Sequence, residues 1–159
     1  MQALDASSII YAWDNYPETQ FPGLWGWLAS QVETAELTIS SVALNEVIDK
    51  SPECGTWLKA IPVQVLSESV QSLRLAAQIQ STLGVINGKY GSGVGSNDLR
   101  IISIAKIANA ELLTNENRQP LLPKSLLKYQ IPAVCDLKSV SVPHLSFLDY
   151  VRRSQQVFG

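Results

Sequence analysis

Short apolar segments alternate with longer helical patterns along the chain, and this alternation restricts the possible folds more than any other feature. Strand-like apolar runs lie at residues 2–4, 37–40, 110–114 and 133–137. The segments between them repeat apolar residues at helical spacing. Such alternation is typical of parallel strands connected by helices. We therefore expect an α/β protein with three α/β/α layers and a central, mainly parallel sheet.

Local signals mark the ends of several expected helices. The helices are expected at residues 7–16, 24–33, 41–50, 53–61, 67–84, 98–109 and 143–153, with a short one inside 115–132. Ser40 or Ser41 can cap the third, because a serine hydroxyl accepts from free amides at a helix start. Ser67 or Ser69 can cap the fifth, and Gly84 stands where a glycine often ends a helix.

The length and composition fit a single domain over residues 1–159, since 46% of the residues are hydrophobic and 16% are charged. No apolar run is long enough to span a membrane, and the first residues lack the basic region of a secretory signal. Cys54 and Cys135 form no CxxC motif, which favours free thiols in a reducing cytoplasm. The net charge of −2 argues against binding nucleic acid by charge alone.

Four acidic residues fall at the junctions of expected elements. Asp5 ends the first strand, Glu46 lies one turn into the helix after the second, Asp98 opens a buried helix, and Glu116 follows the strand at 110–114. The carboxyl ends of parallel strands share one edge of the sheet. We therefore expect these four side chains to converge there.

Several carboxylates in one small site raise one another's pKa and repel, unless a cation lies between them. Mg²⁺ or Mn²⁺ accepts carboxylate and water oxygens and suits such a set. The absence of a His or Cys cluster argues against zinc. The one histidine, His144, is expected to have a structural or surface role.

Each acid also has a purely structural interpretation. Asp5 can cap the following helix, and Glu46 can lie on a solvated helix face beside Lys50. Asp98 can complement the dipole of its own helix. Glu116 has the weakest local signal of the four, because it lies in a polar loop with Asn115 and Asn117.

Taken together, four stretches resemble the PIN domain family of metal-dependent nucleases. They are "LDASSII", "SSVALNEV", "NDLRIISIAKIANAELLTNE" and, for one PIN-like branch, "YPETQFPGLWGWL". The resemblance extends from Met1 to about Val151. The chain departs from the family in having Glu116 where an aspartate is usual and Ala6 where a hydroxyl residue is frequent.

The resemblance implies a Mg²⁺- or Mn²⁺-dependent endoribonuclease. Asp5, Glu46 and Asp98 would bind one or two ions directly, and Glu116 would assist through water or at a second ion. Ser7 or Asn115 would orient ligands or water. The resemblance also implies the toxin of a toxin–antitoxin pair, with RNA as substrate and an antitoxin protein as partner. An exposed Trp25 or Trp27 would indicate a partner or homodimer surface.

Two other functions stay open. One is a PIN-like module that has lost catalysis and serves in binding or assembly. The other is a phosphatase with Asp5 as nucleophile, although Ser7 stands where aspartyl phosphatases have their second aspartate.

The run "GKYGSGVGSND" lacks the P-loop pattern, because Tyr90 follows Lys89. We expect a mobile loop beside the acids, with Lys89 or Tyr90 meeting the substrate. Scattered cations near the expected rim could guide phosphates, and these are Arg100, Lys106, Arg118 and Lys124. The four tryptophans fit helix packing better than base stacking.

Overall fold

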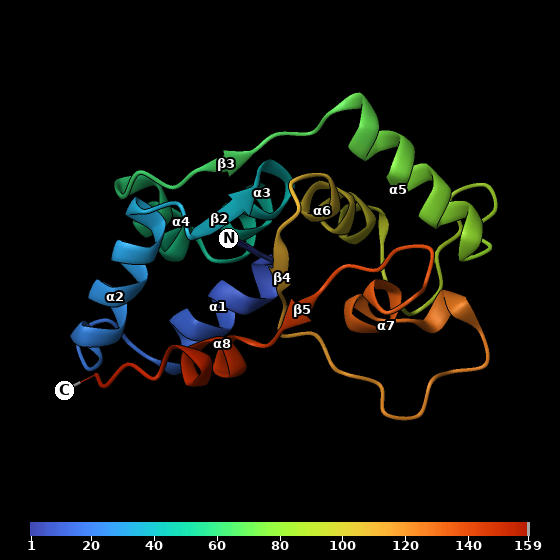
Figure 1. Cartoon of the computed structure of the whole chain (residues 1–159). Coiled ribbons are helices and arrows are strands. Elements are labelled where there is room, and N and C mark those ends of the chain that lie inside the picture. The colour runs from blue at the N-terminus through green and yellow to red at the C-terminus, as the bar shows by residue number, and fades with distance from the viewer. Residues whose placement is uncertain (159) are drawn as a thin grey trace.

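A parallel sheet forms the centre of the computed structural model, which describes residues 1–158, and helices flank it (Figure 1). The sheet has the strand order β3-β2-β1-β4-β5, and each adjacent pair is parallel. The strands are β1 (Gln2–Leu4), β2 (Leu37–Ser40), β3 (Val65–Leu66), β4 (Glu111–Leu113) and β5 (His144–Leu145). The expected three-layer architecture is confirmed.

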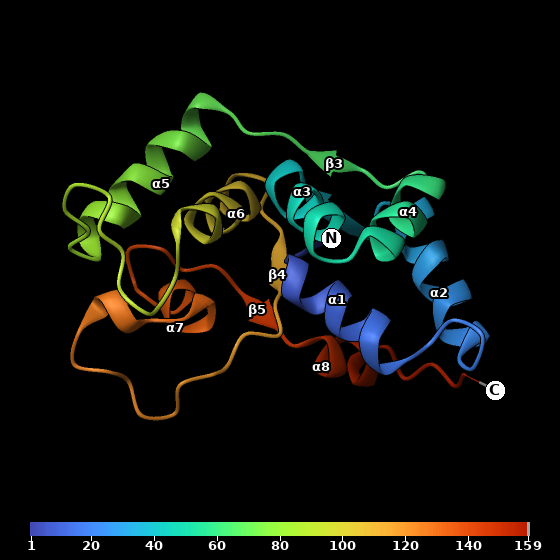
Figure 2. The same cartoon turned by 180° about the vertical axis from the view of Figure 1, so that it is seen from behind.

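Eight α-helices and one short 3₁₀ helix connect the strands within residues 1–158. The helices are α1 (Ala6–Asn15), α2 (Pro22–Glu33), α3 (Ser41–Lys50), α4 (Pro52–Ala60), α5 (Val70–Thr82), α6 (Ser96–Ile107), α7 (Ile131–Cys135), α8 (Phe147–Ser154) and the 3₁₀ helix η1 (Leu126–Lys128). Seen from both sides, α5 lies along α6, and α8 lies beside α1 (Figures 1 and 2). None of these helices is long and apolar enough to cross a membrane.

The expected helix ends are confirmed where side-chain capping fixes them. The Ser40 hydroxyl accepts from the Ala43 amide at 3.0 Å. Ser69 forms a reciprocal capping box at the start of α5. Gly84 follows α5 with a φ of 78°, a backbone conformation that glycine adopts without a steric penalty.

Two expectations at the C-terminal end of the chain are wrong. Residues 133–137 are not a strand, because α7 covers Ile131–Cys135 with a proline in its first turn. The last strand is instead β5, at His144–Leu145. The terminal helix consequently begins at Phe147 rather than at residue 143. A two-residue strand has no periodicity that a sequence pattern can show.

The tryptophans of the N-terminal half pack against other aromatic side chains. Trp25 is buried, and its Nε1 donates to the Tyr16 carbonyl at 2.6 Å. Its ring meets Trp13 and Trp57 edge to face, with centroids 5.2 and 4.8 Å away. Trp27 packs against Tyr150. Trp25 thus offers no partner surface, and a homodimer stays a prediction.

Backbone hydrogen bonds hold the glycine-rich run against η1 and the residue that follows it. The amides of Gly93 and Val94 donate to the carbonyls of Leu127 and Tyr129 at 3.0 and 2.8 Å. A Cβ on Gly93 would lie 2.3 Å from the Tyr129 carbonyl oxygen, so only glycine permits this approach. The expected mobile loop is therefore anchored along its second half.

Both cysteines are buried free thiols, as expected. Burial raises the pKa of the Cys54 thiol to about 12 and raises that of Cys135 as well. Neither thiol is therefore ionised near neutral pH, and neither is a nucleophile.

The fold predicts a large stability difference between two identical leucine substitutions. Leu4 is fully buried in the central strand β1, whereas the side chain of Leu121 is 90% exposed. We expect Leu4→Ala to lower the free energy of unfolding by about 2–5 kcal/mol, because it removes buried methyl groups and leaves a cavity. Leu121→Ala should change it by less than about 0.5 kcal/mol. Chemical denaturation measures both, and equal losses would contradict the assigned core.

Candidate functional site

The carboxyl ends of three strands meet at one edge of the sheet. Leu4 of β1 lies in register with Ile39 of β2 and with Leu113 of β4. The next residues therefore come together, and the Asp5 amide donates to the Leu113 carbonyl at 2.8 Å. This edge positions the first of the predicted acids beside Thr114.

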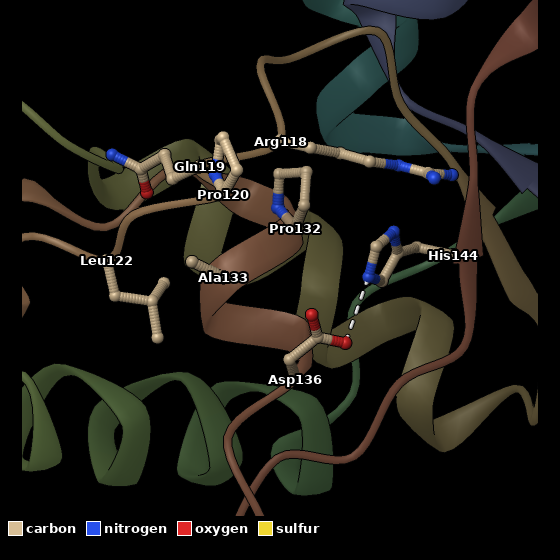
Figure 3. Close-up of a pocket in the computed structure, with 8 residues that line it drawn as sticks. All are labelled: Arg118, Gln119, Pro120, Leu122, Pro132, Ala133, Asp136 and His144. Carbon is tan, nitrogen blue, oxygen red and sulfur yellow. Dashed lines mark hydrogen bonds and ion pairs between the residues drawn. The ribbon is translucent and has the colours of Figure 1, made fainter.

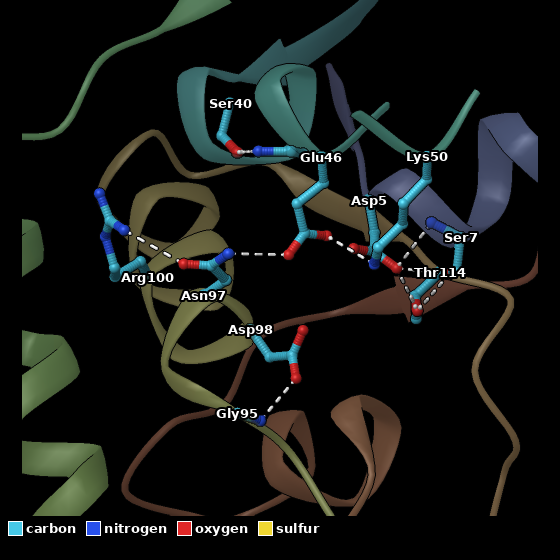
Figure 4. Close-up of polar contacts among 11 residues, drawn as sticks. Asp5, Ser7, Ser40, Glu46, Lys50, Gly95, Asn97, Asp98, Arg100 and Thr114 are labelled. Carbon is cyan, nitrogen blue, oxygen red and sulfur yellow. Dashed lines mark hydrogen bonds and ion pairs between the residues drawn. The ribbon is translucent and has the colours of Figure 1, made fainter. Parts of the chain in front are cut away.

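Asp5 is a buried carboxylate held by hydroxyl groups (Figure 4). Its Oδ2 accepts from the Ser7 hydroxyl, from the Thr114 hydroxyl at 3.1 Å and from the Ser7 amide at 3.3 Å. Among residues 1–158, none donates to Oδ1. Asp5 therefore caps α1, as one interpretation predicted, and keeps one oxygen available at the strand edge.

Burial raises the pKa of Asp5, and the charge of Glu46 adds to the rise, although the hydrogen bonds from Ser7 and Thr114 oppose it. A carboxylate in this position is unfavourable without a counter-ion. The hydroxyls only partly replace the water that it has lost.

Glu46 projects from α3 into a polar network (Figure 4). Its Oε1 accepts from Asn97 Nδ2 at 2.9 Å, and its Oε2 lies 3.5 Å from Lys50 Nζ. Sequence reasoning missed Asn97, Lys50 and Thr114 as site residues. For Lys50 a signal existed, since residues four apart share a helix face.

Asp98 lies in the first turn of α6, where its Oδ2 accepts from the Gly95 amide at 2.6 Å. It complements its own helix, as one interpretation predicted, yet in Figure 4 its second oxygen faces the space below Glu46. Burial raises the pKa of Asp98 to about 6, and the charges of Asp5 and Glu46 contribute to that rise.

Glu116 reaches from the end of β4 to the start of α7. Its Oε2 accepts from the Ile131 amide at 2.9 Å. Burial raises its pKa to about 7, and the charges of Asp98, Asp5 and Glu46 act in the same direction. The charge of Asp5 thus acts on the pKa values of both Asp98 and Glu116.

A pocket of about 460 Å³ lies among these acids. Its lining residues are Glu46, Lys50, Gly95, Ser96, Asn97, Asp98 and Glu116. Asp5 is more deeply buried and does not line it. The pocket therefore combines three carboxylates with one ammonium group.

The donor set fits a hard cation that keeps part of its water shell. Within the described chain, no three His, Cys, Asp or Glu side chains lie close enough in this conformation to bind one ion by themselves. Hydrogen bonds occupy one oxygen of Asp98 and one of Glu116, and both oxygens of Glu46 have partners. Mg²⁺ usually takes one or two carboxylates and retains several waters, so these oxygen donors suit it.

The predicted assisting residues have structural partners. Ser7 Oγ accepts from the Asn115 amide at 2.9 Å, so it joins Asp5 to the segment after β4. Asn115 Oδ1 accepts from the Phe147 amide at 2.9 Å, which turns this side chain toward the start of α8. An assisting part for either residue stays a prediction.

Most of the cations expected at the rim are engaged elsewhere. Arg100 forms two hydrogen bonds of 2.6 Å with Glu68, and Arg118 pairs with Asp149 at 3.0 Å. Lys106 donates to the Ser141 carbonyl at 2.8 Å. The expected guidance of phosphates by this set therefore has little support.

A second cavity, of about 470 Å³, lies between α7 and the segment that precedes η1 (Figure 3). Arg118, Pro132 and His144 are among its lining residues, but none of the four acids is. His144 Nε2 lies 3.0 Å from Asp136 Oδ1. This pair gives the histidine the structural role expected for it.

Comparison with known proteins places the chain in a family. The family model described as "Domain of unknown function (DUF4411)" matches residues 3–158. The chain belongs to the DUF4411 family. No curated protein sequence matches this DUF4411 protein at a significant level.

Solved structures share the fold of this DUF4411 protein. A chain of DNA-bound VapBC from Salmonella typhimurium matches with a TM-score of 0.58 and 21% identity, over 92% of this chain and 99% of that one. A chain of VapBC2 from Rickettsia felis, bound to a promoter DNA fragment, matches with a TM-score of 0.55 and 20% identity, over 91% and 97%. A chain of FitAB bound to an IR36 DNA fragment matches with 0.56 and 16%, over 92% and 95%. These likenesses confirm the PIN-like fold.

The raised pKa values predict a pH-dependent stability of the metal-free protein. The pKa of Asp98 is about 6 in the folded state against 3.8 ordinarily, and that of Glu116 is about 7 against 4.5. The folded state therefore holds these protons more tightly than the unfolded state. Their contribution is fully present below about pH 4 and is lost as the pH rises to about 7.

Asp98→Asn should remove part of the loss of stability that occurs as the pH rises. The asparagine keeps an oxygen that can accept from the Gly95 amide. We expect the variant to gain on the order of 1–3 kcal/mol relative to the wild type between pH 4 and pH 8. Thermal unfolding in chelator at several pH values measures the gain. Asp49→Asn, on the exposed end of α3, serves as the control. If the stability of the wild type and of Asp98→Asn changed equally with pH, the raised pKa assigned to Asp98 would be contradicted.

The Ser7 hydroxyl should contribute measurably to stability, because it contacts Asp5, Thr114 and the Asn115 amide. We expect Ser7→Ala to lower the free energy of unfolding by about 1–3 kcal/mol, since it leaves buried polar groups without partners. Ser81→Ala, at an exposed position of α5, is the matched control. A loss no larger than that of the control would show that the hydroxyl does not hold the strand edge together.

Proposed function

We propose that this DUF4411 protein is a metal-dependent ribonuclease that hydrolyses RNA phosphodiester bonds. The observation that carries the proposal is that three carboxylates, of Glu46, Asp98 and Glu116, line one pocket near the carboxyl edge of a parallel sheet, with the buried Asp5 close enough to act on the pKa values of Asp98 and Glu116. Oxygen ligands without a histidine or cysteine favour Mg²⁺ or Mn²⁺. The PIN-like fold supports the same class of activity.

The acids suited to hold the ion differ in how many of their carboxylate oxygens are available to it. Asp98 and Glu116 each offer the oxygen that does not accept a backbone amide. Asp5 offers Oδ1, while Glu46 has to exchange Lys50 or Asn97 for the ion or its waters. When bound, the divalent cation supplies charge neutralisation for a phosphate and an acidified water.

The other residues of the site fix the orientation of the acids. Thr114 and Ser7 hold Asp5 Oδ2, so its free oxygen keeps one direction. The Gly95 amide does the same for Asp98. Preoriented donors of this kind favour catalysis, because little reorganisation is needed during the reaction.

We further propose that the chain is the toxin of a toxin–antitoxin pair and that a partner protein restrains it. The matching chains come from DNA-bound VapBC and FitAB complexes, and the PIN family that the sequence resembles includes many toxin–antitoxin ribonucleases. Cleavage of cellular RNA by a free toxin would arrest growth. The partner would be expected to cover the acidic pocket.

One observation favours a second candidate, an inactive PIN-like module for binding or assembly. Each of the four acids already has hydrogen-bond partners within the described chain, and no three of them converge on one point. Such a module would bind RNA or protein without cleaving RNA.

RNA cleavage in Mn²⁺ or Mg²⁺ separates the two candidates. We expect the wild type to cleave single-stranded RNA, and Asp5→Asn and Asp98→Asn to lose about 10²-fold or more in rate, because each removes a charge that the ion needs. Chelator should abolish the activity. Growth arrest on expression should follow the same pattern among the variants.

Asp49→Asn provides the matched control, because Asp49 lies on α3 with Glu46 but is exposed and does not line the pocket. It should keep full activity. RNA binding without cleavage by the wild type would favour the inactive module. Turnover of small phosphomonoesters without RNA cleavage would favour the phosphatase.

A further inference from the structure

We propose that Lys50 is the residue through which this chain binds the phosphate backbone of its RNA, and that its ammonium moves from Glu46 to a phosphate when a divalent cation occupies the pocket. This inference rests on the proposed ribonuclease function and adds a specific substrate contact to it.

The position of Lys50 singles it out. It is the last residue of α3, and its Nζ lies 3.5 Å from Glu46 Oε2 at the pocket (Figure 4). Among the residues that line the pocket, it is the only one with a cationic side chain. Its charge also acts on Asp98, on the opposite wall.

The two arginines expected at the rim have carboxylate partners of their own. Arg100 uses both Nε and Nη2 on Glu68, and it donates to Asn97 through Nη1 at 3.2 Å. Arg118 pairs with Asp149. A phosphate in the pocket therefore has Lys50 as the cationic side chain of its lining.

Charge balance explains why the pocket needs such a group. Three carboxylates line it, a fourth, that of Asp5, acts on them from a more buried position, and Lys50 offsets one of these four charges. One divalent cation would still leave a net negative site, which repels a phosphate. The whole chain has a net charge of −2, so it supplies no general attraction for RNA. A mobile ammonium at the rim lowers this barrier locally.

The Lys50 ammonium can leave Glu46 for another anionic partner. Its side chain is 64% exposed, and its pair with Glu46 joins residues four apart on one helix. Pairs of this kind at the surface are weak and form or break easily. A cation that takes the Glu46 carboxylate removes the partner of the ammonium, which can then turn to a phosphate on its flexible stem.

The salt dependence of RNA binding tests the phosphate contact. A short fluorescent single-stranded RNA is titrated with the full chain at several KCl concentrations, with Ca²⁺ replacing Mg²⁺ and RNA integrity checked on gels. Each lysine–phosphate contact contributes about 0.7 to the slope of log K against log salt for single strands. We expect Lys50→Met to lower the slope by about 0.7 and Lys50→Arg to retain it. Lys59→Met, an exposed lysine of α4, should leave it unchanged.

Metal binding tests the exchange. Thermal unfolding is followed in increasing Mn²⁺ without RNA. We expect Lys50→Met to bind Mn²⁺ roughly two- to tenfold more tightly than the wild type, because a competing positive charge is gone. If Lys50 had only a structural role, its substitution by methionine would not weaken RNA binding and at the same time strengthen Mn²⁺ binding.

The outcomes separate this inference from the proposed function. If Asp98→Asn abolishes the Mn²⁺ response and RNA cleavage while Lys50→Met changes neither the salt slope nor the Mn²⁺ affinity, the inference about Lys50 is overturned and the nuclease stands. If the wild type binds neither Mn²⁺ nor RNA, both fall together. The exchange of Lys50 from Glu46 to a phosphate is supported if Lys50→Met lowers the salt slope of RNA binding and raises the Mn²⁺ affinity. Lys50→Arg should retain the salt slope.

Discussion

The buried carboxylate of Asp5 is the constraint on which the rest of the site depends. The central strand ends at Leu4, inside the core, so the next side chain leaves water almost completely. Two hydroxyls, from Ser7 and Thr114, replace part of its hydration. They also join the end of β1 to the end of β4, so the arrangement that tolerates the charge also fixes the strand edge beside the pocket.

Much of the fold was predictable, because β1, β2 and β4 are apolar runs between strong helical patterns. The serine caps at Ser40 and Ser69 and the glycine after α5 act locally and were predicted as well. The two-residue strands β3 and β5 have no pattern of their own, and only neighbouring strands define them. Helix α7 was mistaken for a strand because a short apolar run is ambiguous, and the Glu116 carboxylate that meets its first amide comes from a distant segment.

The sequence predicted the gathering of Glu46, Asp98 and Glu116 at one pocket, since topology brings the ends of parallel strands together. Their surroundings were not predictable. Asn97 contacts Glu46 from another helix, and Thr114 reaches Asp5 from another strand. Such contacts depend on side-chain directions that no spacing in the sequence specifies. The structural and functional interpretations of Asp5 and Asp98 also proved compatible, because a helix cap occupies only one carboxylate oxygen.

The Glu116 side chain joins the segment after β4 to the start of α7. Its bond to the Ile131 amide fastens a helix whose next residues, Pro132 and Ala133, form a wall of the second cavity. A shift of this carboxylate toward the acids gives up that anchor. A ligand that draws Glu116 into the acidic pocket would therefore also change the wall of the second cavity, because the same side chain holds the start of α7.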